Sequence, residues 1–236
     1  MAKLISQLIS RQAVAAGTMA FFLKRPVDFV FKAGQFIDLT LIDPPETDAE
    51  GNTRAFSLAS APDDTNLMVA TRLRDTAFKR IFQTMPIGSD LQITNPIGSF
   101  TLHNDATKSA VFLIGGVGIT PIRSILLEAA SQKLPHHLYL FFSNRRPEDA
   151  PFLEELQELT KTNPNFQLIA TMTEAAGWTG ETGYIDAAMV KKYITDLSGA
   201  IWYLAGPLAM VTAMRAVLKE LEIDEDNIRS EEFSGY

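Results

Sequence analysis

The sequence contains no cysteine and only three histidines among its 236 residues. The absence of cysteine excludes disulfides, thiolate catalysis, cysteine-ligated zinc and any iron–sulfur cluster held by cysteines of this chain. The three histidines, His103, His136 and His137, lack the His-x3-His spacing and the carboxylate partner typical of a metal site. We therefore expect no metal and assign the histidines structural roles.

Long apolar runs are also missing, because no stretch of about 18 consecutive apolar residues occurs. We therefore expect no membrane insertion. The short apolar stretches near the N-terminus are interrupted by Ser, Gln and Arg, so we expect no secretory signal and a cytoplasmic location.

Positive charge is scarce. The chain has 21 Lys and Arg against 28 Asp and Glu, which gives a net charge of −7 and a pI near 5.0. This balance argues against general binding to nucleic acid or to anionic membranes. The balance does not exclude a local basic patch, which could be formed by Arg72, Arg74, Lys79 and Arg80.

The first half of the chain has the pattern of short strands separated by Gly, Pro, Asn and Asp turns. We expect strands at residues 4–15, 18–23, 35–42, 54–60, 67–71 and 90–94. One helix is expected at residues 77–85. Several short strands at this spacing are typical of an antiparallel barrel.

The second half alternates between apolar strand patterns and helical patterns. We expect strands at residues 110–114, 137–142, 166–171, 201–204 and 228–231. Helices are expected at residues 121–132, 151–161, 186–192 and 208–221, with Glu154, Glu155 and Glu158 on a solvated face. This alternation indicates a doubly wound parallel sheet. The sequence thus predicts a two-domain β + α/β fold, with an antiparallel β-barrel at residues 1–104 and the α/β domain at residues 105–236.

Arg54-Ala55-Phe56-Ser57 places a cation, an aromatic ring and a hydroxyl within one expected strand. Arg54 can neutralise a phosphate through its planar guanidinium, and Phe56 can pack flat on a ring system. Thr76, at an expected helix start, can cap that helix and present backbone N–H groups to a diphosphate. From spacing alone, a core phenylalanine and a capped helix without a ligand are the favoured explanation of these residues.

Gly115-Gly116-Val117-Gly118-Ile119-Thr120-Pro121 follows an apolar strand and opens a helix, which is the geometry in which backbone N–H groups meet a phosphate. Pro121 replaces the third glycine of the dinucleotide fingerprint. Ala205-Gly206-Pro207 is a second turn of this kind, and such turns border the ligand crevice of a doubly wound sheet. A tight turn without a ligand remains the alternative for both.

In their order along the chain, these segments resemble the ferredoxin–NADP⁺ reductase family of flavoproteins. Gly34-Gln35-Phe36, Gly98-x-Phe100 and Glu231-x-Phe233 extend the resemblance over essentially the whole chain. The resemblance implies a flavin-binding barrel at residues 1–104 and an NAD(P)-binding domain at residues 105–236. It also implies FAD rather than FMN, because most of the family uses FAD.

The resemblance assigns residues position by position. Arg54 matches the arginine on the flavin phosphates, Phe56 the aromatic residue that packs on the isoalloxazine ring, and Ser57 the hydroxyl near its reactive edge. Glu231 and Phe233 match a C-terminal acid and aromatic residue close to the flavin. Ser57, Glu231 and Phe233 are therefore the candidate catalytic residues.

The candidate cofactor-binding residues fall into two groups. The flavin group is Arg54, Ala55, Phe56, Ser57, Thr71, Arg72, Thr76, Ala77, Phe78, Lys79 and Phe233. The pyridine-nucleotide group is Gly116, Gly118, Ile119, Thr120, Pro121, Asn144, Arg145, Thr173, Glu174, Ala205, Gly206, Pro207 and Met210.

Three departures from the family pattern matter. Phe56 stands where tyrosine is usual, and Ala205 stands where a cysteine near the nicotinamide is often found. NADP-preferring relatives carry Ser-Arg where this chain has Thr173-Glu174. A carboxylate repels a 2′-phosphate but accepts a hydrogen bond from a ribose 2′-hydroxyl, which favours NADH. Arg145 and Arg146 could still supply a phosphate clamp elsewhere.

The function that we expect is a flavin-dependent oxidoreductase. It would move electrons from NADH or NADPH through FAD to a separate carrier protein, such as a ferredoxin or flavodoxin. A reductase of free flavin, quinone or another small acceptor is the enzymatic alternative. A nucleotide-responsive flavin-binding module without efficient turnover is the alternative from another class.

Overall fold

The computed structural model describes residues 3–233. Its first sheet is antiparallel and has the strand order β4-β3-β6-β1-β2-β5. The strands are β1 (Lys3–Ala15), β2 (Thr18–Lys24), β3 (Phe36–Leu41), β4 (Thr53–Ser57), β5 (Asn66–Arg72) and β6 (Asp90–Thr94). The six strands match the six expected from period-two patterns and turns.

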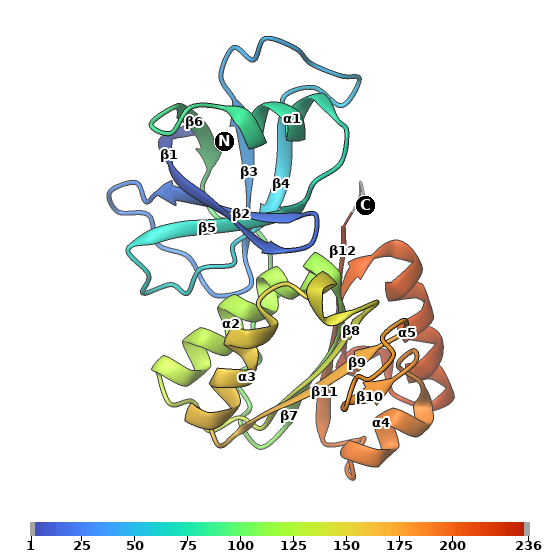
Figure 1. Ribbon diagram of the computed structural model, residues 1–236. Coiled ribbons are helices and arrows are strands. Elements are labelled where there is room, and N and C mark those ends of the chain that lie inside the picture. Colours follow the sequence, from blue (N-terminus) through green and yellow to red (C-terminus); the bar gives the residue numbers. More distant parts are fainter. Residues whose placement is uncertain (1–2, 234–236) are drawn as a thin grey trace.

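This sheet curls toward a barrel, so that the strands at the two ends of the order approach each other (Figure 1). Ala59, just beyond β4, donates a backbone hydrogen bond of 2.7 Å to the carbonyl of Met68 in β5. Helix α1 (Ala77–Thr84) packs on the barrel through Phe78 and Phe82, both fully buried. The ring of Phe82 stacks on Phe21 with centroids 3.8 Å apart.

The second sheet is parallel, in the order β10-β9-β8-β7-β11-β12. Its strands are β7 (Ser109–Gly115), β8 (Leu138–Asn144), β9 (Phe166–Met172), β10 (Glu181–Thr182), β11 (Ala200–Pro207) and β12 (Ile228–Phe233). The helices are α2 (Ile119–Ser131), α3 (Leu153–Thr162), α4 (Ala187–Tyr193) and α5 (Leu208–Glu220). Three 3₁₀ turns are η1 (Gly116–Gly118), η2 (Pro147–Asp149) and η3 (Glu225–Asn227).

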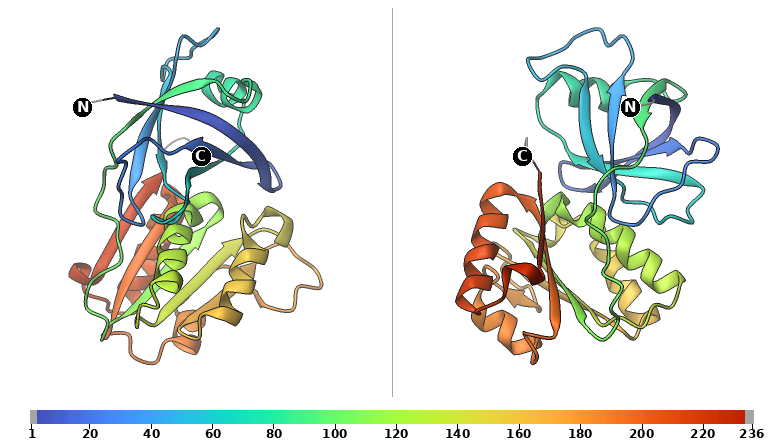
Figure 2. Two further views of the ribbon diagram at one scale, coloured as in Figure 1. Left: turned by 90° about the vertical axis from the view of Figure 1, so that its left-hand side faces the viewer. Right: turned by 180° about the vertical axis from the view of Figure 1, so that it is seen from behind.

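Helices α2 and α3 cover one face of the parallel sheet, and α4 and α5 cover the other (Figures 1 and 2). This arrangement confirms the predicted doubly wound sheet. Within the described residues, no helix is both long and apolar enough to cross a membrane.

Two details of the second sheet differ from the sequence prediction. The edge strand β10 was not predicted, because a strand of two residues is too short to show an alternating pattern of apolar and polar residues. The strand expected to end at Leu204 continues to Pro207, because β12 pairs alongside β11 from Trp202 to Pro207 and keeps the backbone extended. Ala205-Gly206-Pro207 is therefore the end of a strand that leads directly into α5.

Apolar packing joins the two sheets. Val117 of η1 is buried in a cluster with Ala20, Ala59, Met68 and Ala70 from the barrel. The small barrel side chains let the turn after β7 approach the barrel closely. The carboxyl edge of the parallel sheet therefore faces the barrel.

Polar bonds from α2 fix the same contact. Arg123, which is 7% exposed, donates to the carbonyl of Ala59 and makes a bidentate ion pair with Glu155 of α3 at 2.6 and 2.7 Å. Ser124 donates to the carbonyl of Ser60. Glu155 was expected on a solvated face; its side chain is 39% exposed, but its carboxylate also neutralises this buried guanidinium.

Arg123→Met should lower the free energy of unfolding by about 2 kcal/mol, because it removes charge-assisted hydrogen bonds at a buried position. Urea denaturation followed by circular dichroism measures the loss. Lys161→Met is the matched control, since Lys161 pairs with Glu158 on the solvent side of α3 with both side chains about two-thirds exposed. We expect a change below about 0.5 kcal/mol for the control. Equal losses in both variants would contradict the role of Arg123.

Candidate functional site

A cavity of about 410 Å³ lies between the barrel and the carboxyl edge of the parallel sheet. Its lining residues come from both domains. They are Phe36, Glu50, Arg54, Ala55, Phe56, Ser57, Ala70, Thr71, Thr76, Lys79, Thr120, Glu231, Glu232 and Phe233. The structure thus brings together most of the barrel residues singled out from the sequence, together with Thr120, Glu231 and Phe233 from the second domain.

Strand β4 supplies the cation and the ring. Phe56 is 8% exposed and packs against Phe78 of α1 with ring centroids 5.8 Å apart. It therefore belongs to the barrel core and to the cavity wall at once, so the two interpretations of this residue are compatible. The guanidinium of Arg54 lies 5.2 Å from the centroid of the Phe78 ring, a cation–π contact that places it beside the start of α1.

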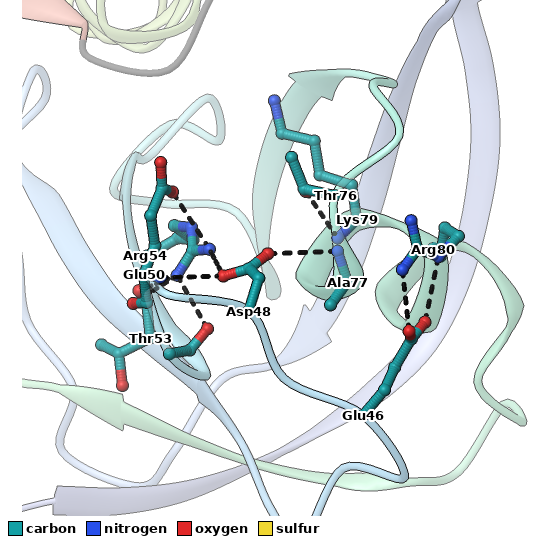
Figure 3. A network of polar contacts seen from close by, with 10 residues as sticks. Glu46, Asp48, Glu50, Thr53, Arg54, Thr76, Ala77, Lys79 and Arg80 are labelled. Carbon is teal, nitrogen blue, oxygen red and sulfur yellow. Dashed lines mark hydrogen bonds and ion pairs between the residues drawn. The ribbon is translucent and has the colours of Figure 1, made fainter.

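Arg54 also bonds to the loop that precedes β4 (Figure 3). Its Nη1 donates to the carbonyls of Glu50 and Gly51 at 2.9 and 3.0 Å. Its Nη2 makes ion pairs with Asp48 at 3.0 Å and Glu50 at 3.1 Å. Burial opposes the ionisation of Asp48. Hydrogen bonds from Arg54 and from the amides of Glu50 and Ala77, with the charge of Arg54, outweigh it and hold the pKa of Asp48 below 3.8.

The N-terminus of α1 adds further positive potential. Thr76 caps the helix, as predicted, by accepting from the amide of Lys79 at 3.3 Å. Burial, and then the charges of Arg74 and Arg54, lower the pKa of the Lys79 ammonium. A guanidinium, an ammonium and a helix N-terminus at one end of the cavity are suited to bind a phosphate.

Ser57 and Glu231 meet across the two domains. Ser57 Oγ donates to Glu231 Oε2 at 3.4 Å, although 174 positions separate the residues. Glu231 lies on β12 opposite Ala205 of β11. Burial raises the pKa of Glu231 to about 7, and the hydrogen bond from Ser57 only partly offsets that effect. A carboxyl group of this kind can hold or release a proton near neutral pH.

A second group of predicted residues lies at the carboxyl edge of the parallel sheet, outside the set that lines the cavity. The backbone amide of Thr173 donates to the carbonyl of Asn144 at 3.0 Å, and the backbone amide of Glu174 donates to that of Arg145 at 2.8 Å. The two pairs therefore lie side by side at the carboxyl ends of β8 and β9. The side-chain amide nitrogen of Asn144 is buried and has no hydrogen-bond partner among the described residues. An orphaned donor at this edge is suited to a ligand oxygen.

The glycines of the first turn have different roles. Gly116 has φ +52°, a left-handed conformation that favours glycine, and its Cβ position meets only open space. A Cβ on Gly118 would lie 2.3 Å from the carbonyl oxygen of Ala205, so packing explains this glycine without a ligand. Pro121 lies in the first turn of α2, as predicted.

The remaining predicted residues are not among the lining residues of the cavity. They are Arg72, Ala77, Phe78, Gly116, Gly118, Ile119, Pro121, Asn144, Arg145, Thr173, Glu174, Ala205, Gly206, Pro207 and Met210. Sequence reasoning did not select Phe36, Glu50, Ala70 and Glu232, which do line it. Only Phe36 carried a signal, through its place in Gly34-Gln35-Phe36.

Known proteins resemble this chain in sequence. The family described as "Oxidoreductase NAD-binding domain" matches residues 112–216. The chain is 29% identical over 225 residues to the glycine betaine monooxygenase reductase subunit of Chromohalobacter salexigens, covering 92% of this chain and 60% of that relative. It is 28% identical over 215 residues to ferredoxin–NADP reductase B of Sorangium cellulosum, covering 87% and 86% of the two chains.

A solved structure shows the same fold. Flavohemoglobin from Malassezia yamatoensis, with bound FAD and heme, superimposes with a TM-score of 0.84 at 26% identity, covering 99% of this chain and 61% of that one. The chain therefore spans about three fifths of the length of this structure and of the betaine monooxygenase relative.

Glu231→Gln should stabilise the fold at pH 8 and have little effect at pH 4. The folded protein keeps a proton on Glu231 between the ordinary value of 4.5 and its raised pKa of about 7. The free energy of unfolding therefore falls as the pH rises through this window. Glutamine removes that penalty, which amounts to about 2–3 kcal/mol at pH 8.

Urea denaturation of wild type and variant at both pH values measures the effect. Glu232→Gln is the control, because its exposed side chain lies on the same strand. A gain of the same size at pH 4 and pH 8 would show that Glu231 does not titrate in this window.

Proposed function

We propose that the chain is a member of the ferredoxin–NADP⁺ reductase family and that it moves electrons from NAD(P)H through bound FAD to a separate acceptor. The observation that carries the proposal is the cavity between the domains. It has phosphate-binding groups at Arg54 and the start of α1, an aromatic ring at Phe56, and a titratable carboxyl at Glu231.

The residues of the cavity fit a flavin nucleotide. Arg54, Lys79 and the capped N-terminus of α1 would hold the phosphates, while Phe56 would pack against the ring system. A flavin held there would supply the chemistry of accepting a hydride from the nicotinamide and of passing the two electrons onward. On this proposal, residues 1–104 hold FAD and residues 105–236 hold the pyridine nucleotide.

The reactive end of the flavin site would be formed by Ser57, Glu231 and Phe233. Glu231, with its pKa of about 7, can exchange a proton with solvent at neutral pH. Ser57, which donates to Glu231, would connect this carboxyl group to a heteroatom of the flavin by a hydrogen bond. Phe233 lines the same cavity from the end of β12. Its ring would exclude water from the reactive edge until the nicotinamide replaces it.

The carboxyl edge of the parallel sheet would hold NADH in preference to NADPH. Glu174 follows β9, and its exposed carboxylate lies 3.8 Å from Nε of Arg145. A carboxylate there accepts a hydrogen bond from a ribose hydroxyl and repels a 2′-phosphate. The buried side-chain amide of Asn144, at the end of β8, would supply a donor at the same edge of the sheet.

The acceptor that we propose is a separate electron-carrier protein, such as a ferredoxin, a flavodoxin or an oxygenase component. One relative is named as the reductase subunit of a monooxygenase and another as a ferredoxin–NADP reductase. Since this chain contains no cysteine, it holds no cysteine-ligated cluster that could accept the electrons internally.

The first test is the visible spectrum of the purified protein, reconstituted with FAD and mixed anaerobically with NADH. We expect a flavin spectrum that bleaches within seconds, followed by turnover when ferricyanide is added. A protein that binds neither FAD nor FMN would contradict the proposal. Bound flavin that NADH and NADPH leave oxidised would favour a binding module over a reductase.

Glu174→Arg should shift preference toward NADPH, lowering the ratio of kcat/KM for NADH over NADPH by about tenfold or more, equivalent to about 1.4 kcal/mol. The change replaces a repulsive carboxylate with a guanidinium that can pair with the 2′-phosphate. Glu158→Arg is the matched control, because it alters the net charge equally on the exposed face of α3. An unchanged ratio for Glu174→Arg would place the 2′ position elsewhere.

A further inference from the structure

The phosphate end of the cavity depends on an acidic loop that precedes β4. Asp48 in this loop reaches two separate elements with one carboxylate (Figure 3). Its Oδ1 accepts from Arg54 Nη2 at 3.0 Å, and its Oδ2 accepts from the amide of Ala77, the first residue of α1, at 3.1 Å. The two phosphate-binding elements of the proposed site are thus joined through a single side chain.

We infer that Asp48 is a positioning residue, which holds Arg54 and the N-terminus of α1 at the separation that a flavin phosphate requires. The inference rests on the proposed function, because it deepens the assignment of the flavin site.

The position of Asp48 is itself fixed by the loop. Its Oδ1 also accepts from the amide of Glu50 at 3.0 Å, and its carbonyl accepts from the amide of Gly51 at 2.9 Å. Gly51 has φ +73°, which suits glycine in such a turn. The turn therefore orients the carboxylate of Asp48 toward Arg54 and Ala77 without the help of a ligand.

Asp48 acts from behind the cavity wall. Arg54, Thr76 and Glu50 line the cavity, whereas Asp48 is absent from its lining residues. Its side chain is 30% exposed. A bound phosphate would meet Arg54 and the start of α1 from the cavity, while Asp48, which does not line the cavity, holds both of them. Because Asp48 holds the flexible side chain of Arg54 in one conformation, less conformational entropy is lost when the ligand binds.

Glu50 binds the same guanidinium in a different way. It pairs with Arg54 Nη2 at 3.1 Å, its side chain is 65% exposed, and it lines the cavity. A phosphate arriving from the cavity would meet the negative charge of Glu50 directly. Asp48 and Glu50 thus share one nitrogen of Arg54, but of the two only Glu50 lines the cavity and would lie directly against the ligand.

A third acid anchors the far end of the loop. Glu46 pairs with Arg80 of α1 at 2.7 and 3.0 Å, and both side chains are nearly half exposed. This pair holds the loop against α1 without touching Arg54. Glu46→Gln therefore loosens the loop while leaving the Asp48 carboxylate in place, which makes it a matched control.

The experiment measures the affinity of flavin-free protein for FAD, FMN and riboflavin by quenching of flavin fluorescence. Asp48→Ala should weaken FAD and FMN at least tenfold and leave riboflavin, which has no phosphate, within twofold of wild type. Asp48→Asn keeps a carbonyl acceptor but loses the charge toward Arg54, so it should weaken FAD by an intermediate factor. Arg54→Ala is the reference for losing the phosphate contact itself.

The loop variants complete the test. Glu46→Gln should leave all three affinities within twofold of wild type, and Glu50→Gln should tighten FAD and FMN. Equal weakening of all three flavins by Asp48→Ala would indicate a general disturbance and overturn the inference. Unchanged or tighter FAD binding in Asp48→Ala and Asp48→Asn would also overturn it. If wild type binds none of the flavins, the proposed function itself fails, which is a distinguishable result.

Discussion

The contact between the start of α2 and the barrel is the constraint on which the rest of the site depends. Arg123 and Ser124 donate to the carbonyls of Ala59 and Ser60, which directly continue β4. The strand that carries Arg54 to Ser57 is therefore tied to the second domain just past its end. Val117 packs into the alanine-rich surface beside it. These bonds place the carboxyl edge of the parallel sheet next to the barrel and so create the cavity.

Much of this architecture could be predicted from the sequence, because in each longer element the apolar residues recur at the spacing of a helix or a strand. Turn residues such as Gly, Pro, Asn and Asp mark where these elements end. Thr76 was identified as a helix cap, and Pro121 as a first-turn residue, for local steric reasons that hold in any fold. The resemblance placed Ser57 and Glu231 near one another, which no local pattern could do. The role of Glu155 was missed because its exposed helical spacing gives no sign of a buried arginine on a neighbouring helix.

The bridge from Asp48 to Arg54 and Ala77 was equally invisible in the sequence. It depends on a turn whose geometry brings one carboxylate both to Arg54 of β4 and to Ala77 of α1, which lies 29 positions further along the chain than Asp48. The composition of the loop that contains Glu46, Asp48 and Glu50 indicates no more than an acidic segment exposed to solvent. Its meaning appears only when the partners of each carboxylate are known, because three acids of similar charge then have three different structural roles.

The hydrogen bond between Ser57 and Glu231 has a mechanical consequence. The two residues belong to different domains, and Glu231 owes its raised pKa to the enclosure that the domains form together. Any motion that separates the domains would hydrate the carboxyl group and favour its ionised form. By reciprocity, deprotonation of Glu231 favours separation of the domains. Proton release from Glu231 and separation of the two domains are therefore thermodynamically linked.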